Sequence, residues 1–155
     1  MTLTTPPSYD ISTDARRLDV QAIHAYLSTA YWSPGVPLEV VQRAIAHSVC
    51  VGAYDADAQI GFARVVTDRA TFAYLADVYV LESHRGRGLS KRMLGALLAL
   101  PELQGLRRML LVTRDAHGLY AGFGFTPLAN PSRFMERHHP DAYATPSGTR
   151  PATEP

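Results

Sequence analysis

The chain has 155 residues, of which 46% are apolar, so it is long enough for one domain with a substantial core and too short for two ordinary domains. Fifteen basic side chains against fourteen acidic ones leave a formal net charge of +1, which excludes a general attraction to nucleic acid or to an anionic membrane. The sequence holds no apolar run long enough to span a bilayer, and its first residues lack the charged and apolar regions of a signal peptide. A cytoplasmic protein is therefore expected.

The cysteine and histidine content limits the chemistry further. The single cysteine, Cys50, cannot form a disulfide within the chain, and it lies in an apolar run at 48–52 that predicts a buried strand. We interpret it as structural rather than as a nucleophile. The histidines show neither His-Glu-x-x-His spacing nor pairing with cysteine, so no metal site is expected.

Both ends of the chain differ in composition from its middle. Residues 1–8 are rich in Thr and Pro, and residues 138–155 are rich in Pro and small polar residues, so both tails are expected to be disordered. A single domain is left at 9–137.

Two helices are predicted at the start of this domain. The first is capped at or near Asp14 and is broken by Pro34 and Gly35, and the second spans 37–47. Strands follow at 48–54 and 59–67, and the turn residues between them predict an antiparallel pair.

A third strand at 71–81 completes a meander. Its aromatic and β-branched residues are apolar on both faces, which is typical of a central strand. Strict alternation places Leu75, Asp77 and Tyr79 on one face and Val80 on the other. A carboxylate in such an apolar setting is expected only with a partner or a function.

The second half alternates helix and strand. Apolar residues at three- and four-residue spacing predict a helix at 89–100, which Pro101 ends. A strand at 108–113 then implies a right-handed parallel crossover, so the sheet is predicted to be mixed. A short helix at 116–123 and a last edge strand at 133–136 complete the predicted elements.

The segment Arg85-Gly86-Arg87-Gly88-Leu89-Ser90 joins the central strand to the helix that follows it. The two glycines allow a sharp turn that presents several backbone N–H groups toward one point at a helix N-terminus, where a phosphate is favoured. It lacks the Lys-Ser or Lys-Thr of a P-loop and the third glycine of the dinucleotide fingerprint. A tight connection with solvated arginines is the alternative.

With these motifs, residues 9–137 resemble the GCN5-related N-acetyltransferase (GNAT) superfamily. The loop at 85–90 is similar to the family's acyl-CoA pyrophosphate loop, although Ser90 stands where glycine or alanine is usual. Tyr120, four residues before Gly124-Phe125, matches a second motif in the right order. The resemblance implies an α/β (α+β) fold with a mixed, mostly antiparallel sheet of six to seven strands, about four flanking helices and splayed central strands.

The resemblance also implies acetyl-CoA as the acyl donor, held by the central strand, the loop and the start of the short helix. The residues concerned are Val78, Tyr79, Val80, Arg85, Gly86, Arg87, Gly88, Leu89, Ser90, Asp115 and His117. The side chain of Tyr79 is equally compatible with core filling, Asp115 with a helix cap, and His117 with simple exposure.

Two catalytic residues are predicted. Tyr120 matches the family's general acid, which would protonate the leaving thiolate. Asp77 would bind the substrate ammonium, take its proton through water, or both; the alternative is a structural carboxylate paired with an arginine such as Arg64.

The acceptor is expected near the loop between the first two helices. Tyr26, Tyr31 and Trp32 could form an aromatic, cation-friendly pocket or fill the core. With Arg64 they are the candidate substrate-binding residues.

The predicted function is transfer of an acetyl group from acetyl-CoA to a primary amine of a small molecule or peptide, by direct attack in a ternary complex. The alternative is a non-catalytic acyl-CoA-binding or regulatory module. The near-zero net charge argues against a nucleic-acid partner, no membrane partner is expected, and a homodimer is possible from the resemblance.

Overall fold

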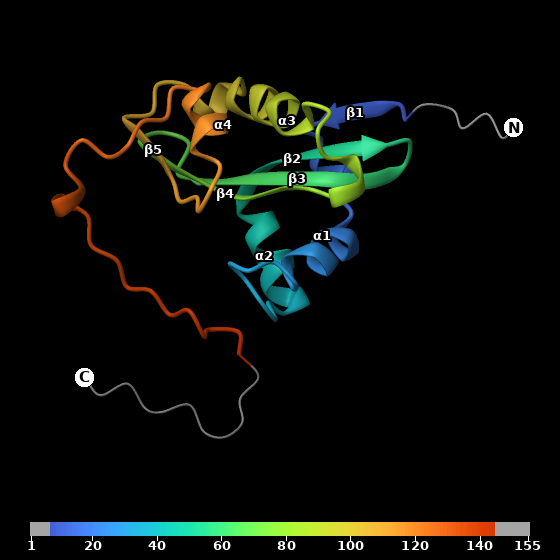
Figure 1. Ribbon diagram of the computed structural model, residues 1–155, viewed down its shortest axis with the longest axis horizontal. Helices are drawn as coiled ribbons and strands as arrows, with labels where there is room; N and C mark the ends of the chain where they lie inside the picture. Colours follow the sequence, from blue (N-terminus) through green and yellow to red (C-terminus); the bar gives the residue numbers. More distant parts are fainter. Residues whose placement is uncertain (1–6, 145–155) are drawn as a thin grey trace, which may run out of the picture.

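The computed structural model describes residues 7–144. One five-stranded sheet, in the order β1-β2-β3-β4-β5, is covered by α1 and α2 on one face and by α3 and α4 on the other (Figure 1). The strands are β1 (Tyr9–Ser12), β2 (Ser48–Asp55), β3 (Ala58–Thr67), β4 (Phe72–Val80) and β5 (Arg108–Leu111). The helices are α1 (Val20–Leu27), α2 (Leu38–Ala46), α3 (Leu89–Leu98) and α4 (His117–Ala121).

The two faces of the sheet carry separate apolar clusters. Under α3 and α4, fully buried Met93, Leu94 and Leu97 pack against Val51 and Val65 of the central strands. Under α1 and α2, the second cluster includes these residues: Ile23, Leu27, Val41, Cys50, Phe62 and Tyr79. Because both faces are covered, β2 to β4 read as nearly continuous apolar runs.

Strand β4 contains an irregularity that the alternation pattern did not predict. Phe62 of β3 pairs with Tyr79, but Arg64 pairs with Ala76, so β4 carries one extra residue at Asp77. Asp77 has φ 56°, in the left-handed region. Beyond this bulge the faces exchange, and the prediction that Leu75 and Tyr79 share a face was therefore wrong: Leu75 packs under α3 and Tyr79 under α1.

The crossover through α3 makes β4 and β5 parallel, as predicted. Their pairing runs from Phe72 with Arg108 to Leu75 with Leu111 and then stops. Since β4 continues to Val80, its last part lies beyond the end of β5. The residues of β4 after Leu75 therefore have no neighbouring strand on the β5 side within residues 7–144.

The prediction of six to seven strands was wrong, because five form within residues 7–144. The segment 133–136 makes no strand; Pro131 instead begins a single 3-10 turn, Pro131–Arg133, and the chain then runs away from β5 (Figure 1). Proline cannot donate to a strand ladder, which opposes pairing here.

The N-terminal part also differs from the expectation of one helix after Asp14. Asp14 caps only a 3-10 turn, Ala15–Arg17, and Asp19 caps α1 through the backbone N–H of Ala22. The strand β1, which pairs with β2 from Tyr9 to Ser12, was not predicted. The expected disorder at 1–6 and 145–155 lies outside the described residues. None of the helices in the described part is long and apolar enough to cross a membrane.

Candidate active site

The loop between β4 and α3 has the backbone of an anion site. Gly86 and Gly88 have φ 78° and 72°, and a Cβ at either would meet no atom within 4 Å, so the space above both is open. Gly88 is the N-cap of the ten-residue helix α3, and no side chain caps its first turn. A hollow of about 310 Å³ opens over the loop. These free amides and this space fit a pyrophosphate group.

The two loop arginines are held differently. Arg85 folds back, its Nε donating to the carbonyl of Val80 at 2.9 Å and a terminal nitrogen to the Tyr26 hydroxyl at 3.2 Å. It therefore fixes the loop to β4 and α1. Arg87 donates to the Tyr9 hydroxyl at 3.0 Å and stays exposed beside the hollow.

The residues predicted for the pantetheine arm lie on the part of β4 that extends past β5. Val78 follows the bulge and is half-buried, and Val80 lines the hollow over the loop. Tyr79 points the other way, into the cluster under α1, where its ring stacks on Tyr26 at 3.9 Å between centroids. Burial in this cluster also raises the pKa of the Tyr79 phenol. The side chain therefore fills the core, and only the backbone of Tyr79 lies along the part of β4 that extends past β5.

Tyr120 lies in α4, which directly follows β5, and only 8% of it is exposed. Gly124, with φ 88°, turns the chain so that the amide of Phe125 donates to the Tyr120 carbonyl at 3.2 Å. The Phe125 ring then meets the Tyr120 ring edge-on at 6.1 Å. The four-residue spacing between Tyr120 and Gly124 therefore allows the contacts with Phe125 that hold this tyrosine in place.

Burial raises the pKa of the Tyr120 phenol, and the nearby Tyr31 and Asp115 raise it further. A phenol normally titrates near pH 10. Tyr120 is therefore protonated at neutral pH and can donate a proton.

The start of α4 is exposed. Asp115 does not cap the helix: the N-cap is Ala116, whose amide donates to the Thr113 hydroxyl at 3.0 Å. His117 begins the helix and is exposed, and it has no side-chain hydrogen bond within residues 7–144.

Asp77 is paired. Its Oδ2 accepts from Nε of Arg64 at 2.5 Å, and its Oδ1 accepts from Nε1 of Trp32 at 2.8 Å. Arg64 also donates to the Ser48 hydroxyl at 3.2 Å. The side chains of Asp77 and Arg64 are 11% and 19% exposed, so the ion pair is largely removed from solvent. The bulge directs the carboxylate to the α1 and α2 side.

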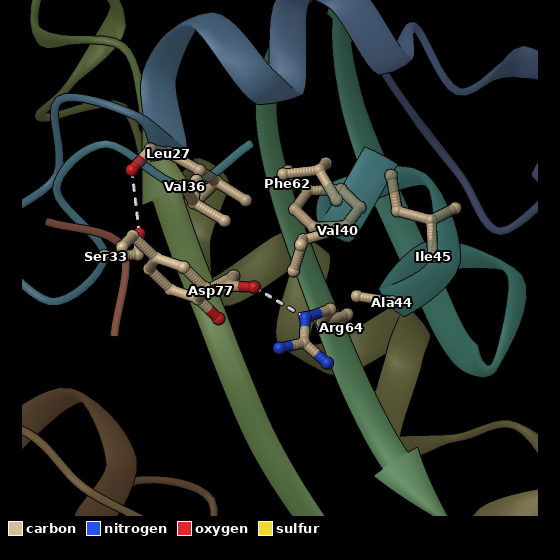
Figure 2. Close-up of a pocket in the computed structure, with 11 residues that line it drawn as sticks. Leu27, Ser33, Val36, Val40, Ala44, Ile45, Phe62, Arg64 and Asp77 are labelled. Atoms are coloured by element: carbon tan, nitrogen blue, oxygen red, sulfur yellow. Dashed lines mark hydrogen bonds and ion pairs between the residues drawn. The ribbon is translucent and has the colours of Figure 1, made fainter. Parts of the chain in front are cut away.

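This ion pair forms the floor of a pocket of about 90 Å³ between β3, β4, α1 and α2. Figure 2 shows Arg64 and Asp77 pointing toward each other and joined by their hydrogen bond, below the apolar side chains of Val36, Val40 and Ile45. The three candidate aromatic residues make different contacts. Trp32 donates a hydrogen bond to Asp77, Tyr31 packs under the guanidinium of Arg114 at 3.9 Å, and Tyr26 stacks on Tyr79 in the core.

No three His, Cys, Asp or Glu side chains in the described ranges gather as a metal site would require. Burial raises the pKa of the Cys50 thiol to about 12, which opposes the thiolate that a nucleophile or metal ligand needs.

Several residues around the site were missed by the sequence interpretation. His84, Lys91 and Leu119 line the hollow over the loop. His84 directly precedes the glycine loop, which was a usable signal. Tyr9 of β1 and Arg114, which follows β5, reach the site from segments distant in the sequence, and nothing local in the sequence indicates them.

Comparison with known proteins decides the family. A model of the acetyltransferase (GNAT) family matches residues 17–125, which include the loop, Asp77 and Tyr120. The chain belongs to the GNAT acetyltransferase family.

Relatives of this GNAT protein agree. A candidate GNAT acetyltransferase from Xanthomonas campestris pv. campestris has a crystal structure with 53% identity and a TM-score of 0.86, covering 90% of this chain and 99% of that one. A candidate acetyltransferase of Gibberella zeae is 35% identical over 72% of this chain and 75% of its own length. A predicted acetyltransferase of Clostridium acetobutylicum, solved with acetyl-CoA, has 17% identity and a TM-score of 0.62 over 84% of this chain and 95% of that one, a likeness of fold alone.

Proposed function

We propose that this protein transfers the acetyl group of acetyl-CoA to the primary amine of a small molecule or peptide, by direct attack in a ternary complex. One observation carries the proposal: the part of β4 that extends past β5 lies between the hollow of about 310 Å³ over the loop and the pocket at Asp77 on the α1 and α2 side. A protonated, immobilised tyrosine stands on the helix that follows β5.

The donor end is assigned to the loop and to the free edge of β4. The amides of 86–90 would bind the pyrophosphate, and the exposed Arg87 would add charge. The backbone of 78–80 has no strand partner on its β5 side within residues 7–144, so its groups, apart from the Val80 carbonyl that accepts from Arg85, are available to an extended pantetheine arm. Arg85 would act by holding the loop against β4 rather than by direct contact.

The transfer step needs an uncharged amine, a site for the oxyanion and a proton for the thiolate. Asp77 would bind the substrate ammonium as it enters, and the ammonium would then lose a proton to water. An amide near Val78 would face the developing oxyanion. Tyr120 would protonate the sulfur as the carbon–sulfur bond breaks.

The test is thiol release from acetyl-CoA with a panel of small amines and short peptides, together with mass detection of the acetylated product. Tyr120→Phe is expected to lower kcat by about a hundredfold to ten-thousandfold, since that is the usual contribution of a general acid. Tyr54→Phe is the matched control, because Tyr54 is a buried tyrosine of β2 whose hydroxyl makes no hydrogen bond within the described residues.

An unchanged kcat in Tyr120→Phe would remove the acid role. Tight binding of CoA without turnover of any amine would instead favour the non-catalytic module.

Homodimerisation is part of the proposal. The outer edge of β5 has no strand partner within residues 7–144 and borders a hollow of about 720 Å³. Met135, on the segment that leaves this edge, is 98% exposed. A second copy would cover both. Light scattering should give a dimer mass that Met135→Lys lowers; a monomer at all concentrations overturns this part.

A cytoplasmic location is likewise proposed. It rests on the composition of the chain, and cell fractionation tests it.

A further inference from the structure

The pocket beside Asp77 is electrically balanced. Of the residues that line it, only Arg64 and Asp77 carry formal charge, and they pair with each other. The remaining lining is mostly aliphatic, with Val36, Val40 and Ile45 above the ion pair (Figure 2). A site with zero net fixed charge and apolar walls gives no preference to polycations and favours a ligand whose own charges cancel.

The pocket is also small. Its volume is about 90 Å³, smaller than the apolar cavity of about 150 Å³ that binds benzene, so the space holds a group smaller than an aromatic ring. That is room for a short branched aliphatic chain. A sugar ring, an aromatic side chain or the body of a peptide does not fit inside it.

The ion pair keeps unused hydrogen-bonding capacity. A guanidinium has five N–H donors, and Arg64 uses one on Asp77 and one on Ser48. A carboxylate has about four acceptor sites, and Asp77 uses one for Arg64 and one for Trp32. Within residues 7–144, Arg64 can therefore still bind an anion while Asp77 still binds a cation.

The backbone is arranged to present these groups. Asp77 occupies the left-handed region at φ 56° without being glycine, which costs free energy and is typical of functional sites. The bulge that requires this conformation is also what directs the carboxylate toward Arg64 and into the pocket.

We propose that the acceptor is a free α-amino acid with a short aliphatic side chain, of the size of valine. Its ammonium binds Asp77, its carboxylate binds Arg64, and its side chain enters the aliphatic pocket. This inference rests on the proposed acetyl transfer and narrows its substrate class. In the reaction one ammonium proton goes to water, the neutral amine nitrogen bonds to the thioester carbon and the carbon–sulfur bond breaks. The thiolate takes the Tyr120 proton, and the second proton that leaves the nitrogen as the amide forms returns to the Tyr120 phenol through water.

The experiment compares three amines that share one side chain. L-Valine has the carboxylate, valinamide has a neutral amide in its place, and isobutylamine lacks the group altogether. kcat/KM is measured for each by thiol release and product mass. A charge-assisted hydrogen bond supports a preference of about tenfold to a hundredfold, so valine is expected to exceed both analogues by at least that lower figure.

Variants identify the residue responsible. Arg64→Gln should lower kcat/KM for valine about tenfold or more beyond any effect that it has on isobutylamine, so that most of the difference between the two amines disappears. Arg64→Lys, which keeps the charge, should restore part of it. Arg43→Gln is the matched control, since Arg43 is an exposed arginine of α2 that does not line the pocket.

A second variant decides the question if Arg64→Gln does not fold, which thermal unfolding reveals. Ala44 lines the pocket from α2, and Ala44→Leu fills it without breaking the helix. It should lower turnover of valine at least tenfold more than turnover of glycine, which has no side chain to accommodate. An equal effect on both would contradict the placement of the side chain.

The outcomes separate this inference from the proposed function. If isobutylamine or valinamide is acetylated as fast as valine, the amino-acid proposal is overturned and acetyl transfer to amines stands. If no amine is acetylated, the proposed function itself fails.

Discussion

Two glycines of α3 provide a matched test of the donor loop. Gly88 is the N-cap with φ 72°, whereas Gly95 lies within the helix and is exposed. A Cβ at either position would meet no atom within 4 Å, so steric clash is absent from both substitutions. The difference between Gly88→Ala and Gly95→Ala is therefore a difference in backbone conformation alone.

The expected effects have opposite signs. Alanine in the left-handed region costs about 1 to 2 kcal/mol. Alanine in place of glycine within a helix gains about 0.5 to 1 kcal/mol. At about 2 to 4 °C per kcal/mol for a domain of this size, Gly88→Ala should lower Tm by about 2 to 8 °C and Gly95→Ala should raise it by about 1 to 4 °C.

Function should separate the pair as well. Because Gly88 also positions the amides assigned to the pyrophosphate, Gly88→Ala should raise KM for acetyl-CoA, whereas Gly95→Ala should leave it unchanged. Thermal unfolding and saturation kinetics measure the two effects. If Gly88→Ala is as stable as the wild type, or binds acetyl-CoA equally well, then the geometry assigned to this loop is refuted.

Three further predictions concern the rest of the fold. Cys50, whose thiol pKa burial raises to about 12, should resist alkylation at pH 8 in the native protein and react only after unfolding; native labelling would contradict its burial. Asp68 accepts hydrogen bonds from the Thr71 hydroxyl and three backbone amides, which hold its pKa below the usual value. Its stabilisation is therefore present above about pH 4 and lost below it, so Asp68→Ala should lower Tm at pH 7 and the gap should close on acidification. Gly52→Ala would place a Cβ 2.4 Å from the buried Tyr54 hydroxyl and should destabilise the protein by about 1 to 3 kcal/mol in urea unfolding, a result that unchanged stability would exclude.

The parts of the structure that the sequence predicted are those governed by local chemistry. The glycine loop and the helix after it follow from residues 85–98 alone, because φ preferences and apolar spacing act over a few residues. The meander of β2, β3 and β4 follows from turn residues and apolar runs, and it appeared within one or two residues of its predicted bounds.

The parts that were missed depend on contacts between distant segments. The bulge at Asp77 arises from the register of β4 against β3, and no residue near it in the sequence indicates that β4 has one more residue than its partner there. The pairing of Asp77 with Arg64 was weighed as an alternative, but only the fold shows that the pair closes a pocket. The prediction of a strand at 133–136 was wrong because the strand propensity of a segment does not provide a neighbouring strand with which it can pair.

The loop between α1 and α2 connects the two halves of the proposed site. Trp32 donates to Asp77 on β4, while its neighbour Tyr31 packs under Arg114, which follows β5. Two adjacent aromatic residues thus contact both β4 and the segment that follows β5. Tyr31 also lies close enough to Tyr120 to raise the pKa of its phenol.

This contact bears on the direction of proton transfer. Burial opposes a tyrosinate at Tyr120, and Tyr31 and Asp115 oppose it further. Tyr120 is therefore protonated at neutral pH, so it can donate a proton but is a poor base. In the proposed reaction, the loop whose Trp32 donates to Asp77 thus also carries Tyr31, which adds to the effect of burial on the pKa of Tyr120, so the residues assigned to the amine and to the thiolate both depend on one short segment of chain.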